Sequence, residues 1–158
     1  MNNFQINCVL SNCKYTKNLN YLVCAKDQLP NTIETKPAII IMNNQNSNQE
    51  GQHWISIFIP EYGPCCYFDS LGRKPLYYST KLHLLMLKMY EFYNCNEFSY
   101  QAINSTSCGK FCLYFVISMA KGLSMNYILQ RLNYSDKYVN EPLINNFYRR
   151  VKKDCNFM

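Results

Sequence analysis

Cys108 is followed by a glycine and stands between a run of small polar residues and a long apolar segment. The polar run, 105–107, contains good helix N-cap residues, and apolar residues recur through 111–119 until Gly122, a residue type that commonly ends helices. We therefore expect Cys108 on the first turn of a buried helix. There the free backbone N–H groups and the positive end of the helix dipole favour a thiolate over a thiol, which suits a nucleophile.

A histidine and an aspartate lie at the open end of a predicted β-hairpin. Residues 53–59 and 65–70 have strand composition, and 60–64 between them contain two prolines and a glycine. If residue 59 pairs near residue 65, antiparallel partners sum to about 124, which places Asp69 opposite residues 53–55. His53 and Asp69 then meet at one edge of the sheet as a base and its orienting acid. Alone, His53 would be more typical of an ordinary core or surface residue.

The candidate catalytic residues are His53, Asp69, Gln101 and Cys108. We expect Cys108 to attack a peptide carbonyl, His53 to activate the thiol and protonate the leaving amine, and Asp69 to fix the imidazole tautomer. The backbone N–H of Cys108 and the side-chain amide of Gln101 are candidate donors to the oxyanion. Each residue has an ordinary structural alternative. The four together are better explained as the site of a cysteine peptidase.

Length and composition bound the class of protein. A chain of 158 residues with 48% hydrophobic residues predicts one globular domain covering 1–158. No stretch approaches the roughly 18 uncharged apolar residues of a membrane span. The N-terminus lacks the basic and apolar regions of a secretion signal. We therefore expect a protein that is not secreted and does not bind membranes.

Nine cysteines accompany only two histidines, and their gaps lack the paired spacing of zinc sites. We expect no metal ion and a core role for most of these cysteines. The net charge of +6 is partly concentrated in Arg149, Arg150, Lys152 and Lys153. This cluster is either a solvated helix face or a patch that meets nucleic acid, whose contribution would weaken with salt.

The remaining segments give a coarse outline of the chain. Residues 1–37 are ambiguous, and 21–25 are compatible with a strand or a short helix. The other predicted elements are a buried strand at 38–42, an exposed and mobile polar loop at 43–51, a turn at 71–75, a helix beginning at Ser79 or Thr80 and reaching residue 92, a short strand at 98–103, a helix at 125–132 and a last helix opening at 140–142.

Three sequence motifs together resemble adenain, the maturation protease of adenoviruses, with relatives in virophages and Polinton-type elements. They are His53-Trp54 opening an apolar strand, Phe-Asp-Ser-Leu-Gly at 68–72, and Gln101 seven residues before Cys108. The order His, acid, Gln, Cys is shared with SUMO-specific proteases. The resemblance implies an α+β fold with a central mixed, mainly antiparallel sheet flanked by helices. It also implies cleavage of capsid or virion precursor proteins at Gly-containing sites, with substrate contacts at Gly51 and Trp54.

The resemblance has departures and open alternatives. Adenovirus enzymes have Pro-Phe-Gly after the acid, whereas Ser-Leu-Gly follows Asp69 here. In the family an activating peptide forms a disulfide to a cysteine before the glutamine, and Cys95 lies nearer to Gln101 than that spacing. We therefore expect no obligatory cofactor, with stimulation by DNA, a viral peptide or both. We also expect a monomer that acts in the virion and the infected host cell, in the nucleus or a cytoplasmic virus factory.

The sequence is also compatible with two other functions. The first is a SUMO- or ubiquitin-like-protein protease of the same clan; only about 50 residues precede His53, which leaves little room for a modifier-binding extension. The second is a small basic nucleic-acid-binding virion protein in which Cys108 is merely a core residue.

Overall fold

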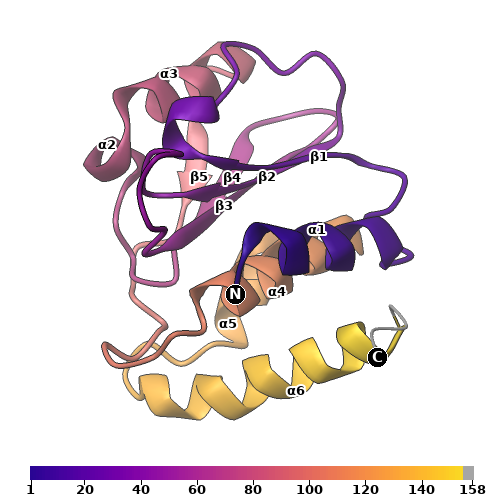
Figure 1. The fold of residues 1–158 in the computed structure, drawn as a ribbon, viewed down its shortest axis with the longest axis vertical. Helices are drawn as coiled ribbons and strands as arrows, with labels where there is room; N and C mark the ends of the chain where they lie inside the picture. Colours follow the sequence, from indigo (N-terminus) through magenta and orange to yellow (C-terminus); the bar gives the residue numbers. More distant parts are fainter. Residues whose placement is uncertain (155–158) are drawn as a thin grey trace.

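A five-stranded sheet runs through the centre of the computed structural model, which describes residues 1–154 (Figure 1). In spatial order the strands are β1 (Asn20–Ala25), β2 (Ala38–Asn43), β3 (Trp54–Ile59), β4 (Cys65–Phe68) and β5 (Tyr93–Cys95). The outer pairs β1/β2 and β4/β5 are parallel, and the inner pairs β2/β3 and β3/β4 are antiparallel. The predicted mixed sheet flanked by helices is confirmed. Within the described residues, however, antiparallel pairs do not outnumber parallel ones.

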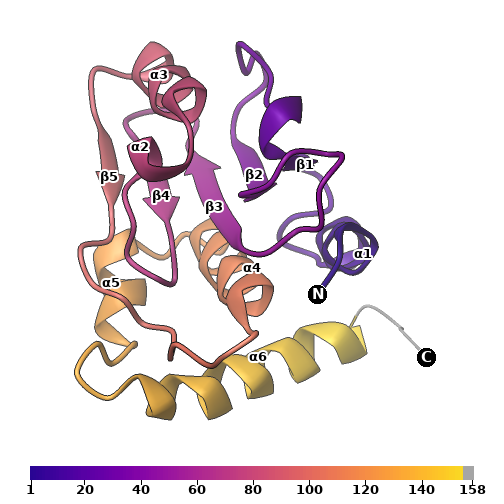
Figure 2. The ribbon, with the colours of Figure 1, turned by 60° about the vertical axis from the view of Figure 1, so that its left-hand side comes forward.

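Helices cover both faces of the sheet. They are α1 (Asn3–Asn12), η1 (Lys26–Gln28), α2 (Pro75–Tyr78), α3 (Thr80–Met89), α4 (Cys108–Ala120), α5 (Met125–Gln130), η2 (Lys137–Val139) and α6 (Asn140–Asp154). Helices α2 and α3 lie on one face, and α1 and α4 lie on the other (Figures 1 and 2). Helix α6 packs against the side of α4 that faces away from the sheet. No helix in residues 1–154 is both long and apolar enough to cross a membrane.

The alternation of side chains along the strands divides the apolar core into two layers. Ile39 and Ile41 of β2 and Phe68 of β4 face α4, while Ile40 and Tyr67 face α3. Both sets are almost completely buried, and β2, β3 and β4 are buried at every position. Two covered faces therefore explain why these strands appear as continuous apolar runs and not as alternating patterns.

Helix α4 is apolar on nearly all sides because it is enclosed by the sheet, α1, α5 and α6. Its residues Phe111, Leu113, Phe115, Val116 and Ile117 are fully buried. Burial of each such side chain contributes about 1.5–3 kcal/mol. The first residue of α4 is therefore attached to one of the most firmly held parts of the molecule.

The hairpin register agrees with the prediction from the sequence. Ser56 pairs with Phe68 and Phe58 pairs with Cys66, so paired residues sum to 124. Extending this register by one residue brings Asp69 opposite Ile55. The end of β4 therefore lies beside the start of β3, where His53 directly precedes the strand.

Several other predictions from the sequence need correction. Residues 98–103 are not a strand: Tyr100 N–H and Gln101 N–H both donate to the Ser70 carbonyl at 2.8 and 2.9 Å, which ties this segment to the end of β4 as a loop. The fifth strand is instead Tyr93–Cys95, and α3 ends at Met89. The predicted loop at 43–51 is exposed from residue 47 to residue 51, but Asn43 is buried as the last residue of β2. Helix α1 was not predicted.

Candidate active site

The structure brings the four candidate residues together at the start of α4. His53, Gln101 and Cys108 line one cavity of about 390 Å³. Asp69 lies behind His53, completely buried. The predicted substrate-contact residues Gly51 and Trp54 line the same cavity.

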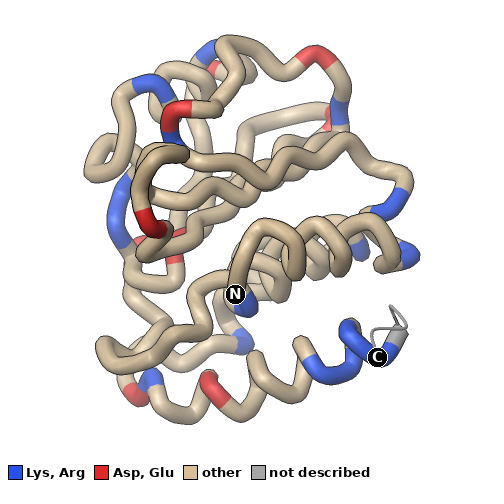
Figure 3. Tube along the Cα trace, viewed as in Figure 1, with Lys and Arg blue, Asp and Glu red and all other residues tan. Residues whose placement is uncertain are grey.

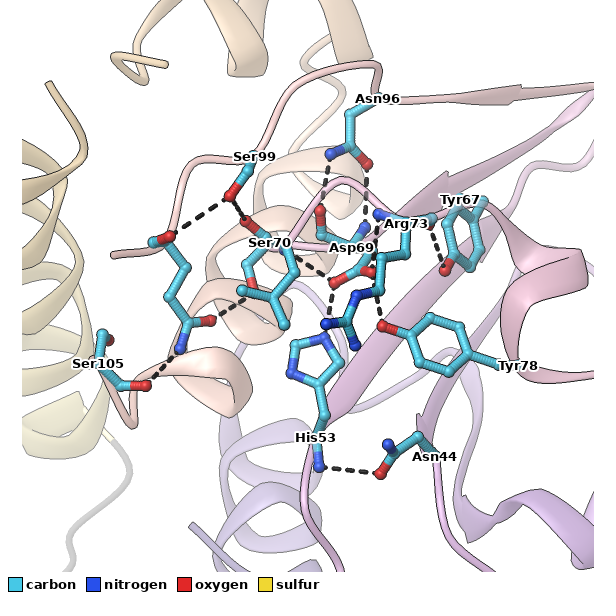
Figure 4. Close-up of polar contacts among 12 residues, drawn as sticks. Asn44, His53, Tyr67, Asp69, Ser70, Arg73, Tyr78, Asn96, Ser99 and Ser105 are labelled. Atoms are coloured by element: carbon cyan, nitrogen blue, oxygen red, sulfur yellow. Dashed lines mark hydrogen bonds and ion pairs between the residues drawn. The ribbon is translucent and has the colours of Figure 1, made fainter. Parts of the chain in front are cut away.

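His53 is held by two hydrogen-bond partners, one for its imidazole and one for its backbone. Its Nε2 lies 2.6 Å from Asp69 Oδ1, and its backbone N–H donates to Asn44 Oδ1 at 3.0 Å (Figure 4). The ring of Tyr78 stacks on the imidazole, with centroids 6.0 Å apart and an angle of 27° between the rings. Since Nε2 is used by the carboxylate, Nδ1 is the nitrogen left for the thiol.

The Asp69 carboxylate is surrounded by donors. Oδ1 also accepts the N–H of Leu71 at 2.9 Å, while Oδ2 accepts the Tyr78 hydroxyl at 2.8 Å and the N–H of Arg73 at 3.0 Å (Figure 4). The polypeptide thus folds back around the carboxylate it carries. A carboxylate that accepts several hydrogen bonds keeps a fixed orientation.

Asn96 fixes the backbone of Asp69 from the neighbouring chain segment. Its Oδ1 accepts Asp69 N–H at 2.9 Å, and its Nδ2 donates to the carbonyls of Asp69 and Phe98 at 2.7 and 2.9 Å. The turn then passes Gly72, whose φ is +74° and whose missing Cβ would lie 2.8 Å from the Phe98 backbone. Only glycine fits a left-handed conformation with so close an approach.

The thiol of Cys108 and the imidazole of His53 stabilise each other's charged forms. Burial disfavours the thiolate, but hydrogen bonding to His53 and to the backbone of Trp54 outweighs it, so the pKa of Cys108 is lowered from its ordinary value. Burial likewise disfavours the imidazolium, but Asp69 and Cys108 raise the pKa of His53 to about 9. Both shifts therefore favour a thiolate–imidazolium pair, the reactive form of a nucleophilic cysteine.

The start of α4 differs from the prediction in one respect. Ser107 occupies the N-cap position, but its side chain caps no helix N–H group. Its hydroxyl donates instead to Glu141 Oε2 of α6 at 2.8 Å. The first-turn N–H groups are thereby left to the sulfur and to a reacting carbonyl, and the N–H of Gly109 helps to lower the pKa of Cys108.

Gln101 is held where an amide donor can face the cavity. Its Nε2 donates to the Ser105 carbonyl at 2.7 Å, which identifies the nitrogen end of the amide, and its Oε1 accepts the Ser70 hydroxyl at 2.6 Å. One of the two N–H bonds of Nε2 remains for an oxyanion. This geometry suits the donor role expected from the sequence.

The charge state predicts a bell-shaped pH dependence for the rate of peptide cleavage. His53 must stay protonated to donate to the leaving amine, so activity should fall as pH rises through about 9. Cys108 must be deprotonated, so the acidic limb should lie below the ordinary thiol pKa of about 8.5. Alkylation of Cys108 by iodoacetamide, followed by mass spectrometry between pH 5 and 10, measures the acidic limb directly. A single alkylation midpoint at the value of a free cysteine peptide would contradict the ion pair.

Some residues around the site were not predicted. Tyr78, Ser70 and Asn96 act through hydrogen bonds between segments 9 to 31 residues apart, and no spacing in the sequence indicates them. Met1 was also missed: its carbonyl accepts the Trp54 indole N–H at 3.1 Å, and its side chain contacts Gly109. Met1 therefore forms part of the cavity wall.

The remaining cysteines are mostly core residues, as expected. Cys13, Cys24, Cys65, Cys66 and Cys112 are buried without disulfides. The other two cysteines that the structure describes, Cys8 and Cys95, are half-buried. The sulfur of Cys95 accepts a hydrogen bond from the Lys74 ammonium at 3.3 Å. Cys155 lies outside the described residues. Within 1–154, no three His, Cys, Asp or Glu side chains are grouped so that they could hold a metal ion.

Together, the fold and the arrangement of Cys108, His53 and Asp69 are those found in cysteine peptidases. Residues 26–156 match the family model of the adenovirus endoprotease. The match covers most of the chain, so this protein belongs to the adenovirus endoprotease family. A search of curated protein sequences found no match.

A solved structure supports the fold. The crystal structure of the ASFV pS273R protease is similar with a TM-score of 0.57 and 19% sequence identity, over 81% of this chain and 60% of that chain. A selenomethionine form of the ASFV protease aligns with a TM-score of 0.42 and 21% identity, over 58% of this chain and 37% of that chain. The chain thus spans about 60% of the length of the first of these proteases.

Proposed function

We propose that this chain is a viral cysteine endopeptidase that cleaves capsid or other virion precursor proteins at Gly-containing sites during particle maturation. One observation carries the proposal. A buried imidazole bridges the Asp69 carboxylate at 2.6 Å and the Cys108 thiol on the first turn of a buried helix. Membership of the adenovirus endoprotease family supports the substrate class.

The chemistry follows from the positions of the groups. The Cys108 thiolate attacks the scissile carbonyl, and the oxyanion is met by the N–H of Cys108 and the amide of Gln101. The His53 imidazolium donates its Nδ1 proton to the leaving amine and then activates water to release the acyl group. Asp69 keeps the tautomer and stabilises the charge throughout. No metal or organic cofactor is needed for these steps.

Incubation of the protein with virion precursors, followed by sequencing of the new N-termini, tests this function. New termini next to glycines are the expected result. The same incubation with the Cys108→Ala variant must leave the precursors intact. Cleavage that persists in that variant would assign the activity to another protein.

The end of α6 supports stimulation by DNA as a further part of the proposal. Arg149, Arg150, Lys152 and Lys153 are all exposed there, on the last turns of one helix (Figure 3). A polyanion bound to this patch would keep the enzyme near nucleic acid inside the particle. We therefore propose that it acts in the virion and the infected cell. We also propose that it acts as a monomer.

Salt dependence distinguishes a DNA-binding patch from an ordinary solvated face. DNA should raise the cleavage rate at low salt, and four phosphate contacts should give a binding slope of about −3.6 against the logarithm of salt concentration. Replacing the four basic residues by alanine should remove both effects. Replacing exposed Lys17 and Lys88 is the matched control. A rate indifferent to DNA at every salt concentration would leave these residues as solvated surface.

A further inference from the structure

A second cavity adjoins the one that contains Cys108. It has a volume of about 410 Å³ and lies between the loop 43–51, η1 and the start of α1. Met1, Gly51 and Trp54 line both cavities, so the two meet across these residues. An extended peptide with its scissile bond at Cys108 can therefore place a neighbouring side chain in the second cavity.

This second cavity is lined by three amide side chains of η1 and the loop 43–51 whose oxygens are already occupied, and by Asn2 of α1, whose oxygen accepts the Gln5 N–H. The bonds are Ala25 N–H to Gln28 Oε1, Gln45 N–H to Asn43 Oδ1 and Asn46 N–H to Gln49 Oε1, each at 3.0 Å. Because a backbone N–H can only donate, each bond identifies the oxygen end of its amide. The three NH₂ groups remain, and they donate no hydrogen bond to another described residue. The cavity therefore offers donors to a ligand.

Asn43 is the most firmly placed of the three. It ends β2 and is only 7% exposed. Gly51 packs directly against it: a Cβ at position 51 would lie 2.4 Å from Asn43 Nδ2. Glycine at this position leaves the Asn43 amide in place. An acceptor from a ligand would pair a donor that is otherwise nearly desolvated.

The charge of the lining restricts what kind of acceptor fits. Among the side chains lining this cavity, the charged one is that of Glu50, which is exposed at the rim. Asp27 lies nearby and fixes the loop by accepting the N–H and hydroxyl of Ser47 at 2.7 and 2.6 Å. Two carboxylates disfavour an acidic ligand, and the amide donors disfavour a basic one. A primary amide offers an oxygen to the donors and N–H groups to Glu50.

We propose that this cavity is a substrate subsite that accepts an asparagine or glutamine side chain near the scissile bond of the cleaved protein. The inference rests on the proposed endopeptidase function and adds a second specificity element to the cleavage site. Glu50 is the residue that excludes glutamate and aspartate from the subsite.

A peptide library tests the subsite. Each position within four residues of the scissile bond is varied in turn, and kcat/KM is measured. The wild-type enzyme should prefer Asn or Gln to Ala about tenfold at one position, and Gln to Glu by a similar factor. Glu50→Gln should lower the Gln-to-Glu ratio toward one and keep a preference for Gln over Ala. Glu61→Gln, an exposed carboxylate in the β3–β4 turn, is the matched control and should change neither.

Binding to the Cys108→Ala variant separates this inference from the proposed function. Peptides with Gln, Glu or Ala at the selected position are titrated by calorimetry. Selective binding of the Gln peptide without cleavage by the wild-type enzyme would overturn the endopeptidase function and keep the subsite. Cleavage with no amide preference, or an unchanged Gln-to-Glu ratio in Glu50→Gln, would overturn the subsite.

Discussion

Replacement of Cys108 by alanine should reduce cleavage of a Gly-containing precursor peptide by at least about 10⁴-fold. The thiolate is the group that bonds to the scissile carbon, and no neighbouring group can replace it: Cys112, one turn further along α4, is fully buried, and burial raises the pKa of its thiol well above the usual value. Single-turnover assays at high enzyme concentration measure the residual rate.

The fold of this variant should be unchanged, because alanine retains the Cβ and is a good helix former. Circular dichroism and the midpoint of thermal unfolding are the checks. Cys8→Ala, a half-buried cysteine of α1, serves as the matched control and should keep full activity. Cleavage by Cys108→Ala at a rate near that of the control would remove Cys108 from the mechanism.

The contact between His53 and Asp69 was predictable because a short turn sets a hairpin register. Once 60–64 is identified as a turn, pairing by position follows, and the observed sum of 124 agrees. Position on the first turn of a helix was predictable for Cys108 for a similar reason: polar residues, then an apolar run, then glycine. Both inferences used only residues close together in the chain.

Two side-chain partners of Asp69 were not predictable, because they come from other elements of the chain. Tyr78 reaches the carboxylate from α2, and Asn96 reaches its backbone from the segment after β5. A tyrosine and an asparagine have many ordinary uses, and nothing in their local sequence indicates this one. Residues 98–103 were mispredicted for the same reason. Their composition is typical of a strand, but hydrogen bonds to Ser70 and Asn96 hold the segment as a loop.

Helix α1 was missed because its pattern is sparse. Only Ile6, Val9 and Leu10 are buried, and asparagines occupy several of the other positions. Its start is instead fixed by a capping box, in which Asn2 Oδ1 accepts Gln5 N–H and Gln5 Oε1 accepts Asn2 N–H, both at 3.0 Å. Glutamine three residues after a capping residue is a recognised signal, so this helix could have been found.

Replacement of Asp69 by asparagine should lower kcat by about 10⁴-fold and also destabilise the fold. An asparagine offers one oxygen where the carboxylate offers two, so its NH₂ group would face donors that now meet an acceptor. With the side chain fully buried, the free energy of unfolding should fall by about 3 kcal/mol. Denaturant unfolding and activity per folded molecule separate the two effects.

The pH dependence of this variant distinguishes a role in catalysis from a role in folding alone. Since Asp69 helps to hold the pKa of His53 at about 9, its loss should move the basic limb of the kcat/KM profile to lower pH. Asp136→Asn, which alters an exposed carboxylate capping η2, is the matched control and should keep the wild-type profile. A destabilised Asp69→Asn enzyme with an unshifted basic limb would show that the carboxylate supports the turn without acting on the imidazole.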